Sequence, residues 1–447
     1  MKPSKYNFFF PIEKTGNFLA FNSLKNGLTV FPETLVHLLQ HMEAGDSLPV
    51  SESILAQLQK GGFVCDDAFD EYGLLQIRRH LQQYGGSFRL GLTIAPTLNC
   101  NLFCSYCFET PQPAIMDGTV IAQLVEMVEG RIKNGLKHLS IQWYGGESLL
   151  CIDIVEELSQ KLMAICETNQ VEYTAHIITN GTLFTRAYAE KLKTLKVTGA
   201  QITLDGDQPF HDARRPYRGG KGSFNTIFAN IIDAAGVLPI SLRVNVDRMN
   251  VDSVLDFFKG MQADPRLEPF FKKGDIHIHY GHVRKYSASC RCSDEECLKD
   301  GEFWQEELKL HQYLCEKRIA TMPFPSFGSG CSATTVNGYV VGPRGELYKC
   351  WNHIGRKEKE VGHIGKEISM NALYISYLTE SFENDAQCRE QCKLLPICMG
   401  GCVDIRINYK KGTFPAIDCT RWKYYLEESV KAYYLASLKK SAAAKDS

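Results

Sequence analysis

The chain has 447 residues, of which 44% are hydrophobic and 23% are charged, and its formal net charge is −1. This length favours two or three domains, and the balanced charge gives no sign of a nucleic-acid partner. No apolar run is long enough to span a membrane, and the one near the start is too short for a signal peptide. The sequence therefore predicts a cytoplasmic protein that binds neither nucleic acid nor membrane.

Seventeen cysteines are the unusual feature of this composition. A reducing cytosol disfavours disulfides, so metal ligation, catalysis or core packing must account for them. Cys65, Cys151 and Cys166 stand alone in apolar surroundings and are interpreted as core residues. Most of the others occur in groups, which favours metal ligation.

Residues 1–85 predict a small winged-helix-like unit. The stretch NFLAFNSLKNGLTVF predicts two short strands joined at Asn26 and Gly27. Helices are expected at PETLVHLLQHM and SESILAQLQKGG, the second ended by glycines, followed by a short strand and a connecting helix.

Residues 86–285 alternate between apolar strand-like runs and helix-like runs. The strand-like runs are FRLGLTIAP, HLSIQWY, EYTAHIIT, GAQITLD, ISLRVNV and DIHIHYG. Repeated βα units require a parallel sheet covered by helices. Six units are too few for a closed eight-stranded barrel, so we expect an α/β fold with a partial (β/α)6 barrel.

The alternation stops after this segment. Residues 286–330 contain one helical run, EFWQEELKLHQYLCEKR, and are interpreted as a bridging region. Residues 331–447 are rich in Cys and Gly and have little periodicity. Such a segment cannot build a large apolar core, so metal sites are expected to stabilise it.

The first group of cysteines lies in TLNCNLFCSYCFE, directly after the first strand of the predicted parallel sheet. Ligands bind at the carboxyl ends of such strands. Cys100, Cys104 and Cys107 are three potential thiolates, whereas a structural zinc ion takes four ligands. The pattern predicts a metal centre with an open position, and a partial zinc knuckle is the alternative.

The spacing CxxxCxxC, with Tyr106 before the last cysteine, resembles the cluster motif of the radical S-adenosylmethionine (SAM) enzymes. The resemblance implies that the three cysteines hold three irons of a [4Fe–4S] cluster and that SAM chelates the fourth. WYGGES after the second strand resembles the family's GGE motif, which implies contacts from Gly145, Gly146 and Glu147 to the methionine amino group.

Three further motifs, TNGT, TLDG and HDARRP, follow in the order expected for that family. The resemblance implies that they supply SAM-pocket or active-site residues, namely Asn180, Thr203, Asp205 and Arg215. The alternative for these four is a turn or barrel-rim role in which the side chain only hydrogen-bonds the backbone.

The C-terminal cysteines are Cys331, Cys350, Cys388, Cys392, Cys398, Cys402 and Cys419, and the stretch CREQCKLLPICMGGC gives the spacing CxxxCxxxxxCxxxC. This pattern resembles the seven-cysteine SPASM domain of peptide-modifying radical SAM enzymes. The resemblance implies two auxiliary [4Fe–4S] clusters, and therefore three clusters in all. One would be held by Cys388, Cys392, Cys398 and Cys419, and the other by Cys331, Cys350 and Cys402.

Some features of this region stay open. The first gap, CxxxC, departs from the family's usual CxxC and puts the geometry of one ligand in doubt. The three-cysteine set has no evident fourth ligand, so its open iron is a candidate to bind a substrate thiolate. A zinc-ribbon-like module is the alternative.

Two other patterns carry weaker predictions. CRCSDEEC, with Cys290, Cys292 and Cys297, is interpreted as a further metal site, a source of the missing ligand, or a turn. His277 and His279 share one face of the last strand, where a polar barrel lining is favoured over a metal site. Cys315 lies in a helical run and is expected to be packed.

The whole layout resembles the SPASM-type maturases of ribosomally made peptides, in particular those of the thioether-forming (ranthipeptide or sactipeptide) type. The resemblance implies that a 5′-deoxyadenosyl radical abstracts hydrogen from a precursor peptide and that Cys-to-carbon thioether crosslinks follow. The N-terminal unit would bind the leader of that precursor, and a flavodoxin or ferredoxin would supply low-potential electrons. The alternatives are a carbon–carbon crosslinking maturase, a sulfatase-maturing enzyme that makes formylglycine, and a non-catalytic iron–sulfur or zinc-binding module.

Overall fold

The computed structural model describes residues 1–43, 45–46, 48–109, 111–286, 290, 293–328, 331–366, 369–414, 416–417 and 419–443. The chain forms two compact units, and each is assembled from stretches that are far apart in the sequence. The first unit combines residues 1–83, 311–331 and 379–447, and the second combines residues 84–310 and 332–378. As functional domains, the four predicted segments stay a prediction.

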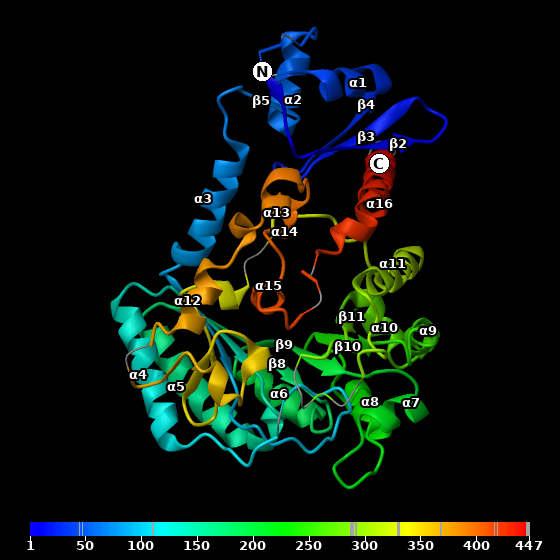
Figure 1. The fold of residues 1–447 in the computed structure, drawn as a ribbon. Helices are drawn as coiled ribbons and strands as arrows, with labels where there is room; N and C mark the ends of the chain where they lie inside the picture. The colour runs from blue at the N-terminus through cyan, green and yellow to red at the C-terminus, as the bar shows by residue number, and fades with distance from the viewer. Residues whose placement is uncertain are drawn as a thin grey trace. The chain divides into compact units, whose positions relative to one another are not determined.

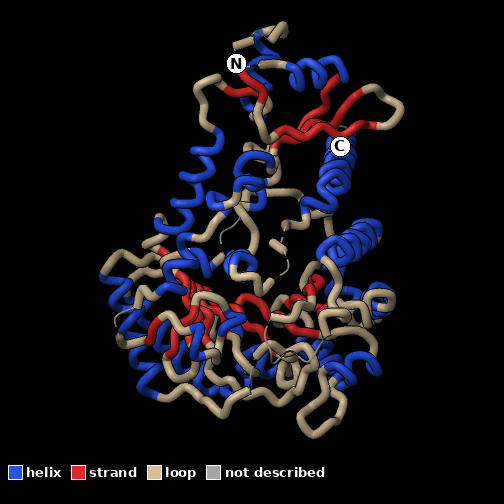
Figure 2. Tube along the Cα trace, viewed as in Figure 1, coloured by secondary structure: helices blue, strands red, loops and turns tan. Residues whose placement is uncertain are grey.

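The second unit has the predicted α/β architecture. Its sheet has the strand order β11-β10-β9-β8-β7-β6-β12-β13-β14, in which β6 to β11 are parallel neighbours (Figures 1 and 2). The six predicted strands are confirmed as β6 Arg89–Ile94, β7 His138–Trp143, β8 Glu172–Thr179, β9 Val197–Thr203, β10 Ile240–Val246 and β11 Ile276–His282.

Helices connect these strands and cover the sheet, as βα repeats require. Their bounds are α4 Gly118–Lys133, α5 Ile152–Thr168, α6 Arg186–Thr194, α7 Gln208–Arg214, α8 Phe224–Ala234, α9 Val254–Ala263 and α10 Glu268–Lys273. Two further helices follow β11 along the chain, α11 Asp300–Glu316 and α12 Ala372–Thr379. Leu92, Ile141 and Ile177 on neighbouring strands are almost completely buried. The sheet therefore has a continuous apolar interior, and its loops can carry polar groups.

Three further strands extend this sheet beyond the predicted six. They are β12 Gly338–Val341, β13 Glu346–Tyr348 and β14 Gly362–His363. β12 pairs parallel to β6, and β13 and β14 continue antiparallel. Strands of two to four residues are too short to give a readable hydrophobic period, so the sequence predicted little regular structure here.

The first unit contains a small antiparallel sheet of order β2-β3-β4, formed by β2 Asn7–Ile12, β3 Asn17–Asn22 and β4 Gly27–Pro32. The predicted turn is confirmed, and Asn26 supplies its left-handed residue with φ of 56°. A second pairing joins β1 Lys2–Pro3 to β5 Val64–Cys65. Helices α1 Glu33–His41, α2 Glu52–Gly61 and α3 Glu71–Tyr84 complete this part, with Gly62 ending α2 in the left-handed conformation.

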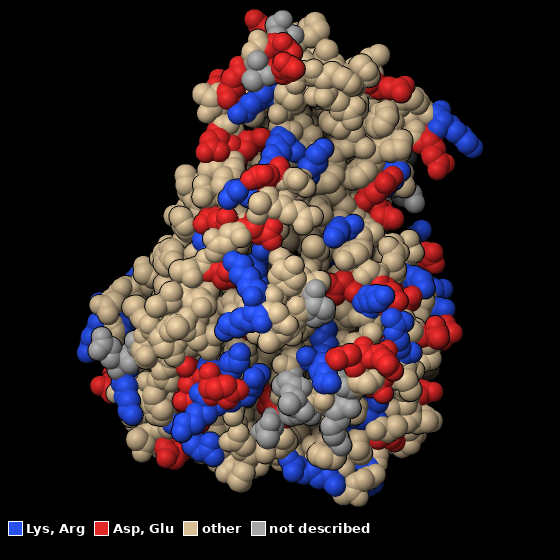
Figure 3. Space-filling model, in the orientation of Figure 1, with Lys and Arg blue, Asp and Glu red and all other residues tan. Residues whose placement is uncertain are grey.

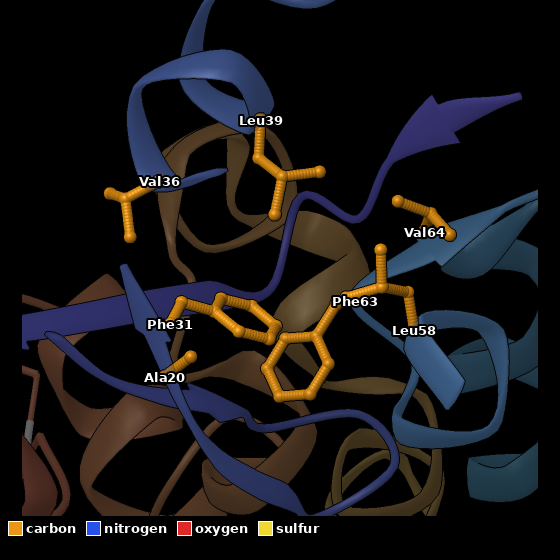
Figure 4. Packing of buried hydrophobic residues seen from close by; sticks show 7 residues of the cluster. All are labelled: Ala20, Phe31, Val36, Leu39, Leu58, Phe63 and Val64. Atoms are coloured by element: carbon orange, nitrogen blue, oxygen red, sulfur yellow. The ribbon is translucent and has the colours of Figure 1, made fainter. Parts of the chain in front are cut away.

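The sheet and the first two helices share an apolar core, shown in Figure 4. The rings of Phe31 and Phe63 meet edge to face with centroids 4.8 Å apart. Val36 and Leu39 from α1 and Leu58 from α2 enclose them. This core is what a small β-domain needs to hold its own shape.

The cysteine-rich C-terminal segment folds in the same unit as these N-terminal strands. Its helices are short, namely α13 Ala386–Gln391, α14 Leu395–Cys398 and α15 Val403–Lys410, before the longer α16 Trp422–Ala443. Leu19 and Phe21 of β3 pack against Ile397, Leu426 and Val430. The N-terminal sheet therefore supplies apolar surface that the C-terminal segment lacks.

The outer surface is mixed in charge. Figure 3 shows Lys and Arg interspersed with Asp and Glu on the face drawn, in agreement with the near-zero net charge. Among the described residues, no helix combines the length and the hydropathy that crossing a bilayer would require.

Candidate functional site

The three cysteines of the first group lie on the loop that follows β6, as predicted. Backbone hydrogen bonds tie this loop to the last residue of α7 and to the segment after it. Phe103 N donates to Pro216 O at 2.8 Å, and Ser105 N donates to Arg214 O at 2.9 Å. Arg218 closes the loop with its Nε, which donates to Cys100 O at 2.6 Å. The thiols are thus carried on a fixed backbone at the carboxyl end of the sheet.

The two glycines after β7 are required because their backbone packs against the cysteine-bearing loop. Gly145 has φ of +103°, and a Cβ there would lie 2.5 Å from Thr97 O. A Cβ on Gly146 would lie 2.2 Å from Asn99 O. These approaches explain both glycines, and their contacts to SAM stay a prediction.

Glu147 is completely buried and links the segment after β7 to the end of β8. Its Oε1 accepts hydrogen bonds from Leu149 N at 3.0 Å and Thr179 Oγ1 at 2.8 Å, and its Oε2 accepts one from Asn180 N at 2.6 Å. Burial raises the pKa of this carboxyl, although the three donors favour the ionised form. The structure therefore gives Glu147 a positioning role between the ends of β7 and β8, and a direct contact to SAM stays a prediction.

Asn180, directly after β8, reaches the first cysteine. Its Nδ2 lies 3.6 Å from Cys100 Sγ and 2.8 Å from Asn101 Oδ1. Its Oδ1 accepts hydrogen bonds from Thr182 N and Thr182 Oγ1. The amide is thus oriented with a donor toward the sulfur, which suits a group that lines a metal-bound thiolate.

A buried network of charges surrounds Tyr106, the residue before Cys107. The Tyr106 hydroxyl donates to Asp205 Oδ2 and accepts from Arg215 Nη1 at 2.6 Å. Arg214 stacks on the same ring at 4.7 Å and pairs with Asp247 at 3.0 Å. Burial alone would raise the pKa of Asp205, but Arg214 and Arg215 outweigh it and hold this pKa below its usual value.

His211 on α7 supports this network from behind. Its Nδ1 accepts from Asp205 N at 3.2 Å, so the neutral ring carries its proton on Nε2, which faces Ser223 Oγ at 3.0 Å. Ser223 Oγ in turn donates to Arg215 O at 2.6 Å. Burial, with the charge of Arg215, lowers the pKa of His211 to about 4. The histidine is therefore a neutral structural residue.

Some predicted residues have fewer specific contacts. Thr203 ends β9 and is nearly buried. His277 and His279 both lie on β11, where His279 Nδ1 is 3.0 Å from Ser241 Oγ. Cys290 is buried, and its thiol donates to Tyr106 O at 3.5 Å, which places this part of the bridging region against the cysteine-bearing loop. Cys292 lies outside the described residues.

Two polar residues beside the triplet were missed by the sequence reading. Glu109 is buried and hydrogen-bonds Tyr144, and burial raises the pKa of this carboxyl to about 7. Tyr144 stacks on Trp351 with centroids 5.9 Å apart. Glu109 stands directly after the motif, and Tyr144 directly precedes the two glycines. Their closeness in sequence to these motifs was the available signal of a functional role, but a single Glu or Tyr is not diagnostic of a site.

The donor set around the triplet fits a metal-bound cluster. Burial raises the pKa of Cys100 to about 12, and burial likewise raises the pKa of Cys104 and Cys107. A negative charge on Cys104 would raise the pKa of Cys100 and of Cys107 further, whereas the charge of Arg215 opposes the rise in the pKa of Cys104. Iron would hold these thiols as thiolates despite burial. Among the described residues, no three His, Cys, Asp or Glu side chains are placed to share one metal ion, and a [4Fe–4S] cluster does not need this because each thiolate binds a different iron.

The four cysteines of the first predicted auxiliary set all fall in the first unit. Burial raises the pKa of Cys398 to about 11, and the charges of Cys392 and Cys419 add to this effect. Cys388 accepts a hydrogen bond from Arg406 Nη2 at 3.5 Å. Cys392 and Cys419 are therefore close enough to Cys398 to influence it, and Cys388 lies beside a cation, which suits a bound anionic cluster.

The second auxiliary set is divided between the units. Cys331 and Cys402 belong to the first unit and influence each other electrostatically. Cys350 follows β13 in the second unit. The grouping of these three cysteines around one cluster stays a prediction.

Comparison with known proteins agrees with this geometry. Residues 94–259 match the radical SAM superfamily. A cysteine-type anaerobic sulfatase-maturating enzyme of Clostridium novyi (strain NT) is 26% identical over 376 residues, which cover 78% of this chain and 97% of that protein.

Two solved structures show the same fold at low sequence identity. Native anSMEcpe with bound AdoMet and Cp18Cys peptide has a TM-score of 0.56 and 19% identity, and the match covers 77% of this chain and 98% of that one. Streptococcus suis SuiB bound to the precursor peptide SuiA has a TM-score of 0.52 and 16% identity, and the match covers 91% of this chain and 96% of that one.

The matched segment includes the cysteine loop, the glycine motif and the network around Tyr106. It implies a [4Fe–4S] cluster and SAM as cofactors, which the buried thiols and their donors suit. The chain therefore carries a radical SAM enzyme segment at residues 94–259, is similar in sequence to the anaerobic sulfatase-maturating enzymes, and shares its fold with SuiB.

Proposed function

We propose that this enzyme matures a ribosomally made precursor peptide by installing thioether crosslinks between a Cys sulfur and a carbon of another residue. The observation that carries the proposal is a peptide-sized groove in the first unit, beside a strand edge that no described strand pairs with. The similarity to a precursor-binding protein over most of the chain supports it.

The groove lies along β4, an edge strand whose partner within the described residues is β3. It has a volume of about 470 Å³ and is lined by β4 itself, by one face of α2 and by Leu35 and Phe63. Its apolar walls include Leu28, Val30 and Ile54. An extended peptide can add to such an edge through main-chain hydrogen bonds, while its alternate side chains enter the groove. We assign this groove to the leader of the precursor.

The match lengths favour a peptide maturase with such an element. The sulfatase-maturating relative from C. novyi is spanned almost to its full length, yet 22% of this chain (100% minus 78%) lies outside that match. The SuiB structure, which holds its precursor peptide, matches 91% of this chain. A region beyond the catalytic fold of the sulfatase-maturating relative is thus present here.

The residues of the second unit would hold and orient the cofactors. Cys100, Cys104 and Cys107 supply the thiolates, Asn180 orients a donor toward one of them, and Arg215 places a fixed positive charge nearby. With cluster and SAM bound, the chemistry supplied is one-electron cleavage of SAM to a 5′-deoxyadenosyl radical that takes a hydrogen atom from the substrate. Burial of these side chains excludes water from the site.

Thioether formation requires an electron acceptor. The new C–S bond replaces one C–H and one S–H bond. The hydrogen atom of the C–H bond leaves to the 5′-deoxyadenosyl radical, the thiol proton leaves to solvent, and one electron remains to be removed. We assign this electron to an auxiliary cluster held by the C-terminal cysteines, with a flavodoxin- or ferredoxin-like protein as the partner that supplies electrons for SAM cleavage.

A second candidate is formylglycine formation on a sulfatase. Its support is the match to the C. novyi enzyme over 97% of that relative's length. The two functions use the same cofactors but give different products, so product analysis separates them.

The test is modification of a short Cys-containing peptide encoded in a neighbouring reading frame, co-expressed with the full chain under anaerobic conditions. We expect loss of two hydrogen atoms per crosslink and a Cys that resists alkylation. A product whose Cys still alkylates indicates carbon–carbon crosslinking. A carbonyl that forms an oxime on a sulfatase-derived Cys peptide, with the precursor left unchanged, would overturn the proposal.

The groove is tested separately, by leader binding to a matched pair of variants. Ile54→Glu places a charge on the wall of the groove at a side chain that is 43% exposed, so folding is preserved. We expect at least about tenfold weaker leader binding by fluorescence anisotropy, since a charge directed at an apolar contact costs at least about 1.4 kcal/mol. Ile77→Glu on α3, at a side chain 58% exposed and outside the groove, is the control. Equal affinity in both variants would remove the groove from the proposal.

A further inference from the structure

Arg406 on α15 is the most deeply buried guanidinium of the cysteine-rich segment, with only 1% of its surface exposed. Its Nη1 donates to Asp385 Oδ2 at 3.0 Å, and its Nη2 donates to Gly400 O at 2.8 Å. The same Nη2 lies 3.5 Å from Cys388 Sγ. A protonated thiol is a weak acceptor, so a cation aimed at it without bound iron has little to gain. A thiolate ligand would be a far stronger partner.

Tyr6, between β1 and β2, presents a second donor to the same region. Its side chain is completely buried, and its hydroxyl has no hydrogen-bond partner among the described residues. Tyr6 belongs to an apolar group against which Cys388 and Cys392 pack. Leaving a buried hydroxyl unpaired costs roughly 1–3 kcal/mol.

Arg406 therefore contacts one member of the cysteine set formed by Cys388, Cys392, Cys398 and Cys419, and Tyr6 belongs to the apolar group against which two members pack. Hydrogen bonds to the sulfur atoms and a nearby positive charge stabilise the reduced, more negative state of an iron–sulfur cluster. Burial excludes the water that would otherwise screen this charge. The neighbouring Lys423 Nζ, at 3.8 Å from Cys419 Sγ, is exposed and contributes less.

We propose that Arg406 and Tyr6 act as positioning residues that raise the reduction potential of the cluster held by these four cysteines. The proposal rests on the auxiliary cluster of the proposed function and deepens it. A raised potential makes this cluster, once oxidised, a competent acceptor for the single electron released when the product bond forms. Because Tyr6 belongs to the N-terminal segment, that segment would contribute to the redox site as well as to leader binding.

The experiment measures the midpoint potential of this cluster in the full-length, anaerobically reconstituted protein. A background with Cys100→Ala, Cys104→Ala, Cys107→Ala and Cys331→Ala removes the signals of the other clusters. Iron content and redox titrations followed by electron paramagnetic resonance are then compared for four variants, namely Tyr6→Phe, Arg406→Gln, Arg406→Lys and the parent.

We expect Arg406→Gln to lower the ratio of reduced to oxidised cluster about tenfold at a fixed potential, which is about 59 mV for a one-electron couple. Tyr6→Phe should lower the ratio about threefold, and Arg406→Lys should fall between the parent and Arg406→Gln because it keeps the charge. Tyr433→Phe, at an exposed tyrosine that contacts Phe324, and Arg78→Gln, at an arginine that donates to Leu24 O, are the matched controls.

The outcomes distinguish a failure of this proposal from a failure of the proposed function on which it rests. A parent protein with no cluster at these four cysteines would remove the auxiliary cluster itself, and the proposal with it. If the parent binds the cluster, and the Tyr6→Phe and Arg406 variants have the same midpoint potential as the parent, only the role of these two residues in raising the potential is overturned. If the Arg406 variants fail to load iron, Tyr6→Phe decides the matter, since it removes one oxygen atom and leaves the packing of the ring in place.

Discussion

The two cysteine-bearing regions of this molecule are built in opposite ways. The loop after β6 is positioned by a regular sheet and by backbone hydrogen bonds to the last residue of α7 and the segment after it. The C-terminal set sits among helices of four to eight residues and borrows apolar surface from β3. The comparison teaches that the fold positions the first cysteine loop, whereas a cluster bound at the second set would contribute to the folding of its own unit.

The strongest way to test this difference is to remove the cysteines of the first site. Cys100→Ala, Cys104→Ala and Cys107→Ala together should abolish 5′-deoxyadenosine formation, measured by chromatography, because no other thiolates lie on that loop. The second unit should still fold, since β6 to β11 are held by their own ladder and core. Cys65→Ala is the control, and it should cleave SAM normally. A triple variant that still forms 5′-deoxyadenosine contradicts the assignment.

Removing a cysteine of the second site should instead unfold part of the molecule. Cys398→Ala should cost the first unit about 4 kcal/mol or more, because bound metal stabilises a segment with little core of its own. Hydrogen exchange is the measurement, with amides of α14 and α15 expected to lose protection while those of β7 and β8 keep it. Equal protection in both units would mean that this segment is as preorganised as the barrel.

The smallest expected effect is a pH dependence of the stability of the second unit. The pKa of His211 is about 4 in the folded protein against an ordinary value of 6.5. The stability that this neutral histidine contributes is therefore complete above about pH 6.5 and is lost as the pH falls toward 4. The expected loss is at most about 3 kcal/mol.

Urea unfolding at several pH values, followed by the fluorescence of the buried Trp143, measures this effect. His211→Gln should flatten the pH dependence between 6.5 and 4, since glutamine can still bond Asp205 N and Ser223 but does not titrate. A variant that keeps the full slope would assign the acid sensitivity to other groups of the unit.

Sequence reasoning predicted the parallel strands and the motifs of the first site because their signals are local. An alternation of apolar runs defines strands such as β8, and a fixed spacing defines the cysteine triplet. It did not predict β12, whose four residues are too few to show a period. It also missed Glu109 and Tyr144, because the role of a single polar residue depends on its neighbours in the folded structure.

The sequence by itself determined the six parallel strands and the spacing of the first cysteine loop, since both follow from patterns within a few residues. The tertiary structure decided which distant segments share a unit, how Glu147 is used, and that Arg406 contacts Cys388, which packs against the apolar group of Tyr6. The physical reason is that burial and hydrogen-bond partners arise when segments hundreds of residues apart pack together. No spacing along the chain encodes that proximity.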